Sequence, residues 1–208
     1  MIAILDYGAG NLKSVEKAFA FLGEAAAVTK SPEVAQKAES LILPGVGAFG
    51  EAAKKLAASG LTNVILEAAK SQKPLLGICL GMQLLFEESD ESPGVAGLGL
   101  FAGKVRHFGS AAEHFPLKIP HMGWNSLCVN PKSRLFAGLK NPYVYFVHSF
   151  FVDAKNQEDV AATSEYEIPF CAAAERDNLF CCQFHPEKSG EAGLAILKNF
   201  AAISNGKQ

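Results

Sequence analysis

An apolar run that ends at a cysteine between two glycines constrains the fold of this chain more than any other feature. The segment reads Leu-Leu-Gly-Ile-Cys-Leu-Gly-Met-Gln over residues 75–83, and a helical pattern follows the cysteine directly. This order predicts a strand, a sharp turn and a helix, with Cys79 held at the turn. Gly77 and Gly81 leave space for the turn because they carry no side chain. We therefore expect a nucleophile elbow in which the N-terminus of the helix stabilises a thiolate on Cys79.

The segments around the elbow predict an α/β fold. Buried strands at 1–6, 26–29, 41–43 and 75–79 alternate with amphipathic helices, which is typical of a mainly parallel sheet covered on both faces. After about residue 100 the pattern becomes strand-rich. Further strands are expected at 104–108, 126–129, 143–152, 160–163 and 170–184, the last interrupted by a turn at 176–178, and a closing helix at 190–203. With 208 residues and 49% apolar composition, residues 1–208 are predicted to form a single domain.

A histidine and a carboxylate lie two residues apart near the C-terminal end of the chain. The sequence from Phe180 runs Phe-Cys-Cys-Gln-Phe-His-Pro-Glu-Lys-Ser, so that an apolar strand ends near His185 and Glu187. At strand spacing both side chains would point to the same face. Glu187 could then accept a hydrogen bond from one ring nitrogen of His185 and leave the other free to exchange a proton with Cys79. The pattern favours cysteine-based nucleophilic catalysis.

Each of these motifs also has a purely structural interpretation. An unpaired cysteine is commonly an inert core residue. The Pro-Gly-Val-Gly-Ala-Phe-Gly segment at 44–50 could be only a tight strand-to-helix connection, or it could direct a backbone N–H group towards an oxyanion beside Cys79. Trp124 could be an ordinary core aromatic. Lys188 is by composition a surface residue, although it adjoins the His-Pro-Glu motif.

Composition argues against several other classes of function. A net charge of -2 without a basic block gives no indication of nucleic-acid binding. No apolar run is long enough to span a membrane, and the start of the chain lacks the basic region of a signal peptide. Five cysteines without paired spacing predict neither disulfides nor a metal site, and a cytoplasmic location fits best. The dinucleotide and Walker A patterns are incomplete, so no cofactor is expected.

Three motifs taken together resemble the class I, triad-type glutamine amidotransferases. They are Gly-x-Cys-x-Gly-x-Gln at 77–83, Phe-His-Pro-Glu at 184–187 and the Pro-Gly-x-Gly loop at 44–47. The resemblance implies that Cys79 attacks the side-chain amide of L-glutamine, that His185 transfers the protons and that Glu187 orients His185. It further implies an oxyanion hole formed by the N–H groups of Val46 and Leu80. The glutamine-binding residues implied by the family are Gly47, Gln83, Ser149 and Phe150, the last at a position where related chains often carry tyrosine.

Within that family, further motifs are similar to the glutaminase subunits of imidazole glycerol phosphate synthases. These motifs are Asp-Tyr-Gly-Ala-Gly-Asn at 6–11, Pro-His-Met-Gly-Trp-Asn at 120–125, Tyr-Phe-Val-His-Ser at 145–149 and Glu-Lys-Ser at 187–189. The resemblance implies a partner, a (β/α)8-barrel cyclase that receives ammonia through a closed path. Because free ammonia would be protonated and diluted in water, a glutaminase without an acceptor site needs such a partner. The interface or gate positions implied by the resemblance are Asn11, Trp124, Tyr145 and Lys188.

Three alternatives remain open from the sequence. The glutaminase subunit of pyridoxal 5'-phosphate synthase has the same triad, although its oxyanion loop normally carries two adjacent glycines where this chain has Gly45-Val46. A cysteine hydrolase of the same superfamily usually has its histidine close after the elbow, whereas His185 lies over a hundred residues downstream of Cys79. A catalytically silent binding module would be expected to lack a member of the triad, and all three members are present.

Overall fold

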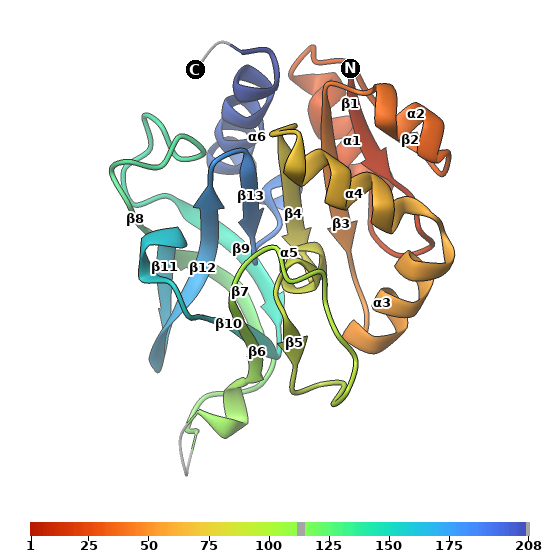
Figure 1. Ribbon diagram of the computed structural model, residues 1–208. Helices are drawn as coiled ribbons and strands as arrows, with labels where there is room; N and C mark the ends of the chain where they lie inside the picture. The colour runs from red at the N-terminus through yellow and green to blue at the C-terminus, as the bar shows by residue number, and fades with distance from the viewer. Residues whose placement is uncertain (112–114, 207–208) are drawn as a thin grey trace.

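The parallel half of the central sheet holds the elbow strand between two parallel neighbours. A computed structural model describes residues 1–111 and 115–206. Five parallel strands lie side by side in the order β2 (Ala26–Thr29), β1 (Ile2–Leu5), β3 (Ser40–Gly45), β4 (Leu75–Cys79) and β13 (Leu179–Cys182). Because β3, β4 and β13 are parallel neighbours, the loops that follow them meet at one edge of the sheet (Figure 1). The glycine loop at 44–50, the elbow at 75–83 and the His-Pro-Glu motif at 184–187 therefore lie at this edge.

The strand-rich C-terminal half extends the same sheet. Antiparallel pairing continues it from β13 to β12 (Ile168–Arg176), β10 (Phe150–Ala154) and β6 (Gly103–His107), after which β5 (Glu88–Ser89) pairs parallel to β6. Two further strands, β11 (Val160–Tyr166) and β8 (Cys128–Val129), attach beside β12. A separate two-stranded sheet consists of β7 (His121–Ser126) and β9 (Tyr143–His148).

Helices cover both faces of the parallel half because its strands are apolar on both sides. One face packs against α1 (Leu12–Phe21) and α6 (Gly190–Ser204) through a core that contains Ile4, Phe19 and Phe200. The other face, with Leu5 and Leu43, packs against α2 (Pro32–Lys37), α3 (Phe49–Ala58), α4 (Leu61–Lys70) and α5 (Leu80–Leu85). Short 3-10 turns occur at η1 (Phe108–Ser110), η2 (Gln157–Asp159) and η3 (Pro186–Lys188).

The α/β class, the central sheet with flanking helices and the strand-rich second half are confirmed. The elbow strand occupies 75–79 as predicted, and the turn at 176–178 forms a hairpin between β12 and β13. The prediction of one continuous strand over 143–152 is wrong. The chain leaves the two-stranded sheet after His148, passes through Ser149 and enters the central sheet at Phe150, because the two segments pair with different partners.

The strand predicted at 126–129 is also misplaced. Residues 121–126 form β7, and only Cys128 and Val129 form the next strand, because Leu127 turns into the core between them. Within the described ranges, the structure has no helix of the length and apolarity needed to cross a membrane.

Candidate functional site

The turn after β4 holds Cys79 in a strained backbone conformation. Its φ of 56° and ψ of -111° lie outside the regions that residues with a side chain normally occupy. The turn is tight because α5 begins at the next residue and packs onto β3. A Cβ atom added at Gly81 would lie 1.8 Å from the carbonyl oxygen of Leu43, and one added at Gly77 would lie 2.9 Å from that of Gly81. The two glycines are therefore required by close backbone approach.

Cys79 and His185 line one cavity of about 350 Å³ at the carboxyl edge of the parallel strands. The cavity also contains all six residues that the family resemblance assigned to the oxyanion hole and to glutamine: Val46, Leu80, Gly47, Gln83, Ser149 and Phe150. Glu91, Pro120, Val147 and His148 complete its wall. Six separate segments of the sequence thus line the cavity that holds the thiol.

Glu187 lies behind His185, away from the cavity. His185 Nδ1 lies 2.8 Å from Glu187 Oε1, and both side chains are almost fully buried. Strand spacing predicts that the two residues lie on one strand, but β13 ends at Cys182 and Pro186 starts the 3-10 turn η3. Proline fixes φ near the helical range, so the turn rather than strand alternation brings the carboxylate beneath the ring. The bond leaves Nε2 as the free ring nitrogen.

The surroundings of His185 favour its charged form. Burial opposes the charge, but hydrogen bonds to Cys79 and Glu187, together with the negative charges of these groups, more than offset it and raise the pKa of His185 to about 9. At neutral pH the imidazole therefore carries a proton. A protonated histidine beside Cys79 stabilises a thiolate and can supply a proton to a leaving group.

The backbone of His185 is tied to strand β9. His185 N–H donates to the carbonyl oxygen of Tyr145 at 3.0 Å. The buried hydroxyl of Ser189 donates to the carbonyl oxygen of His185 at 2.6 Å and accepts from Tyr145 N–H at 3.0 Å. Both backbone groups of Tyr145 are thus bonded to the segment that carries His185 and Glu187.

Three polar residues near the thiol were missed from the sequence. Gln183 is fully buried, and its Nε2 lies 3.7 Å from Cys79 Sγ. Glu91 accepts from Phe49 N–H at 2.7 Å and reaches the cavity from the loop after β5. The hydroxyl of Tyr7 donates to the carbonyl oxygen of Pro44 at 2.9 Å, and burial raises its pKa, so it remains a neutral donor that anchors the glycine loop. In the sequence, only Gln183 stands out, because it is a polar residue inside the apolar run 179–184.

A pair of histidines supports the wall formed by Ser149 and Phe150. His148 Nδ1 lies 2.8 Å from the carbonyl oxygen of Phe150, and its Nε2 lies 3.0 Å from Nδ1 of His121. Burial lowers the pKa of His148 to about 3 and that of His121 to about 4, so both rings are neutral at pH 7. Since the Phe150 carbonyl can only accept, His148 carries its proton on Nδ1 and accepts from His121.

The other face of the β7–β9 sheet is apolar and exposed. Trp124 is 56% exposed, and it pairs across the strands with Tyr145, whose ring centre lies 6.2 Å away. Met122 and Tyr143 on the same face are 63% and 61% exposed. The core interpretation of Trp124 is therefore wrong. Lys188 is exposed on η3, which contacts β9 and α1, and Asn11 precedes α1 at this edge.

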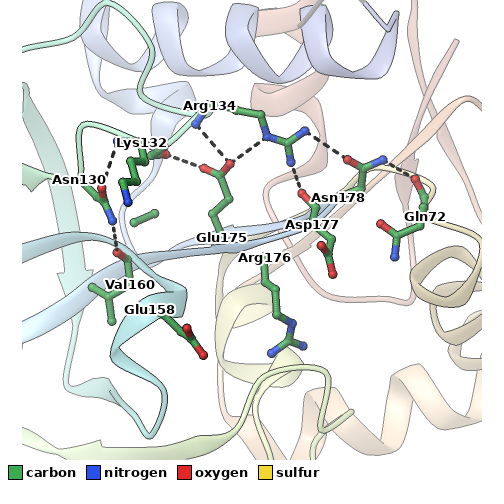
Figure 2. A pocket seen from close by; sticks show the side chains of 12 residues that line it. Gln72, Asn130, Lys132, Arg134, Glu158, Val160, Glu175, Arg176, Asp177 and Asn178 are labelled. Atoms are coloured by element: carbon green, nitrogen blue, oxygen red, sulfur yellow. Dashed lines mark hydrogen bonds and ion pairs between the residues drawn. The ribbon is translucent and has the colours of Figure 1, made fainter.

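A second and larger cavity, of about 520 Å³, lies at the opposite end of the sheet. It is lined by charged and amide side chains around the β12–β13 turn (Figure 2). The guanidinium of Arg134 donates to Glu175 Oε1 at 3.1 Å, to Asn178 Oδ1 at 3.4 Å and to the carbonyl oxygen of Asp177 (Figure 2). Asn178 in turn donates to the carbonyl oxygen of Gln72. These donors are occupied by the protein itself.

Neither cavity presents the ligands of a metal ion. In residues 1–111 and 115–206 no group of three or more histidine, cysteine, aspartate or glutamate side chains is arranged to hold one. The smaller cavity presents the thiol of Cys79 and the charged imidazole of His185.

Comparison with known proteins gives consistent results. The family model described as glutamine amidotransferase class I matches residues 3–203. The chain is 49% identical over 203 residues to imidazole glycerol phosphate synthase subunit HisH of Methanothermobacter thermautotrophicus, with 98% of each chain covered. It is 50% identical over 204 residues to the subunit of the same name from Wolinella succinogenes, covering 98% of this chain and 100% of the relative.

Solved structures share the fold at much lower identity. A crystal structure of a glutamine amidotransferase superposes with a TM-score of 0.77 at 18% identity, covering 99% of this chain and 98% of that one. The glutaminase domain of Trypanosoma brucei CTPS, solved with bound acivicin, superposes with a TM-score of 0.68 at 16% identity, covering 100% of this chain and 94% of that domain.

Proposed function

Because the chain belongs to the class I glutamine amidotransferase family, we propose that it is the glutaminase subunit of an imidazole glycerol phosphate synthase, acting in histidine biosynthesis. It hydrolyses L-glutamine to L-glutamate and ammonia. The observation that carries the chemistry is that Cys79 and His185 line one cavity, while Glu187 lies behind His185 and bonds to its Nδ1. The assignment to this subgroup is supported by 49–50% identity to imidazole glycerol phosphate synthase subunits HisH over almost their whole length.

The reaction begins with attack of Cys79 Sγ on the side-chain carbonyl carbon of glutamine. The carbonyl oxygen becomes an oxyanion, for which Leu80 N–H at the start of α5 and Val46 N–H in the glycine loop are the donors. The proton on His185 passes to the amide nitrogen, the C–N bond breaks, and ammonia leaves a glutamyl thioester. Water, deprotonated by His185, then attacks the thioester and releases glutamate, while Glu187 keeps the imidazole oriented.

The cavity also supplies groups suited to the amino-acid part of the substrate. Gly47, Gln83, Ser149 and Phe150 surround the space next to the thiol. Glu91 is the carboxylate in the described wall, and a carboxylate is the natural partner of the substrate's ammonium group. In this proposal Glu91 joins the four residues expected from the family.

The ammonia is delivered to a cyclase subunit, which we propose to be a (β/α)8 barrel. The exposed apolar face of β7 and β9, with Trp124 and Tyr145, supports a docking surface there, and Asn11 and Lys188 lie at the same edge. Charged residues are depleted and aromatic residues enriched at the centres of such interfaces. All five cysteines are free thiols, which supports a reducing cytoplasm as the location.

Docking is proposed to switch the glutaminase on through the glycine loop. Val46 is β-branched and follows Gly45, so the Gly45–Val46 peptide can rest with its N–H turned away from the oxyanion. Loss of one oxyanion donor costs about a hundredfold or more in rate. A partner that binds better to the inward-facing state would restore the donor.

The test is glutamine turnover by the isolated chain, by its complex with the cyclase, and by that complex with the acceptor nucleotide bound. Turnover should rise by about a hundredfold or more from the first state to the last. Equal turnover in all three states would remove the gating step, and no turnover in any of them would remove the proposed function.

A further inference from the structure

Two glutamine side chains form a buried hydrogen-bonded chain that ends on the nucleophile. Gln83 Nε2, on α5, lies 3.4 Å from the carbonyl oxygen of Phe150 and 3.0 Å from Gln183 Oε1. Gln183 Nε2 lies 3.7 Å from Cys79 Sγ. Gln183 is fully buried and Gln83 is nearly so, which leaves little room for water to replace these contacts.

The orientation of both amides follows from the ends of the chain. A backbone carbonyl can only accept, so Gln83 must present its NH2 group to Phe150. That group has two hydrogens, and the second is donated to Gln183, which must therefore present its oxygen. The NH2 group of Gln183 is then the one that faces the sulfur. His148 donates to the same Phe150 carbonyl at 2.8 Å and helps to fix its position.

Gln183 cannot easily leave this position. Its backbone N–H donates to the carbonyl oxygen of Ala172 at 2.8 Å, which holds the residue in the sheet beside β12. The other groups around the sulfur supply different interactions. His185 supplies positive charge, whereas the Tyr7 hydroxyl donates to Pro44 instead of to the thiol. Gln183 supplies a neutral N–H donor to the sulfur.

We propose that Gln183 is a thiolate-stabilising residue whose side-chain N–H donates to Cys79 Sγ, and that Gln83 is the positioning residue that holds it in that orientation. The inference rests on the proposed function for its catalytic meaning. When water attacks the glutamyl thioester, the C–S bond breaks and its electron pair returns to Sγ. The Gln183 N–H is in place to stabilise that charge, and no proton or electron is transferred by Gln183.

Alkylation of Cys79 by iodoacetamide tests the proposal without glutamine or a partner. The rate at the Cys79 peptide is measured by mass spectrometry in the full chain, which separates it from the exposed Cys128. In Gln183→Met, which keeps the size of the side chain and removes the donor, the rate at pH 7 should fall about tenfold, since hydrogen bonds to charged groups are among the stronger ones. At about pH 10 the variant and the wild type should react at rates within about twofold.

Gln83→Met is the second variant. It leaves the Gln183 donor in the protein but removes the group that orients it, so the alkylation rate at pH 7 should fall by about threefold. Cys182→Ala is the control, because Cys182 is buried next to Gln183 in sequence and bonds to Phe184 rather than to the amide chain. It should lower the melting temperature and leave the alkylation rate within about twofold.

Steady-state kinetics of the complete complex provide the catalytic readout. For Gln183→Met the kcat for glutamine should fall while KM stays within about twofold, because the lost bond is to the nucleophile rather than to the substrate. Alkylation rates at pH 7 equal to the wild type in the folded Gln183→Met variant would overturn the proposal. If that variant does not fold, an unchanged rate in Gln83→Met overturns it instead. A chain that alkylates as expected but does not hydrolyse glutamine contradicts the proposed function and leaves this inference standing.

Discussion

The two cavities at opposite ends of the sheet differ in how their polar groups are used. The larger one is rich in charged side chains, but Arg134 and Glu175 bond to one another, and Arg134 also donates to the carbonyl oxygen of Asp177 (Figure 2). The smaller one holds a thiol at a strained turn, a charged histidine and a wall of backbone groups. Cavity size is therefore a poor guide to function in this molecule. The presence of reactive groups at the wall of a cavity is a better guide to function than its volume.

The network at the amino end has a structural purpose. Glu175 accepts from the backbone N–H groups of Arg134 and Leu135 and from the Ser133 hydroxyl, as well as from the Arg134 guanidinium. It thereby fastens the loop after β8 to the hairpin that leads into β13. His185 follows β13, so this network supports the segment that carries His185 from the opposite end of the sheet.

Among substitutions at the two ends of the sheet, Cys79→Ala should have the largest effect on glutamine hydrolysis. Glutamine hydrolysis should fall by about four powers of ten or more, because no other group in the cavity can form the thioester. Ammonia-dependent synthesis by the complex should survive. Glutamine turnover and ammonia-dependent turnover are measured side by side on one preparation, and substantial glutaminase activity in the variant would contradict the assignment of the nucleophile.

Glu187→Gln should cost less than His185→Asn, by about two powers of ten, since the orienting member of a hydrolytic triad can be the weakest single deletion. The carboxylate bonds to Nδ1 and does not reach the cavity. Both variants are compared at saturating glutamine, with circular dichroism to check the fold. Equal losses in the two variants would show that Glu187 does more than orient the ring.

At the amino end, Glu175→Gln should affect stability and not chemistry. Removing the carboxylate weakens four hydrogen bonds, one of them to a guanidinium that is 36% exposed, so the unfolding free energy should fall by about 2 kcal/mol. Denaturant unfolding gives this value. Glutamine turnover in the complex should stay within about twofold of the wild type. A large loss of kcat in the folded variant would show that the amino-end network also contributes to the chemistry.

The smallest effect is a pH dependence specific to the carboxyl end. No histidine is among the described residues that line the larger cavity, whereas His121 and His148 support the smaller one. The pKa of His121 is lowered to about 4, so its contribution to stability is present above about pH 6.5 and is lost as pH falls towards 4. Between pH 7 and pH 6 the stability of the wild type relative to His121→Gln should fall by roughly 0.7 kcal/mol. A difference that is constant over this range would mean that His121 titrates normally.

The features predictable from the sequence are those specified by neighbouring residues. The elbow at Cys79 is encoded within 75–83, and the alternation of strands and helices before it needs no distant contact. The pairing of His185 with Glu187 was also local, although the 3-10 turn that produces it was not expected. Local spacing was therefore enough to predict that His185 and Glu187 lie together.

The features that were missed depend on contacts between distant segments. Gln83 and Gln183 are a hundred residues apart, and nothing near either residue indicates that they touch. The break at Ser149 arises because the chain changes sheets there, which is set by the partners β7, β6 and β12 rather than by residues 143–152 themselves. The residues around Trp124 alone also allow it to be a core aromatic, and only the family resemblance predicts that Trp124 and Tyr145 lie at a surface.

The clamp between Tyr145 and the His185 segment gives the molecule a mechanical property. Tyr145 contributes its ring to the exposed apolar face, while its backbone N–H and C=O are both bonded to the segment that carries His185. Strand β9 cannot slide or tilt relative to His185 without breaking these bonds. The backbone of Tyr145 is therefore coupled to the backbone of His185 by one direct hydrogen bond and by a second link through the Ser189 hydroxyl. The exposed face around Tyr145 and the buried His185 are therefore held at a fixed position relative to each other.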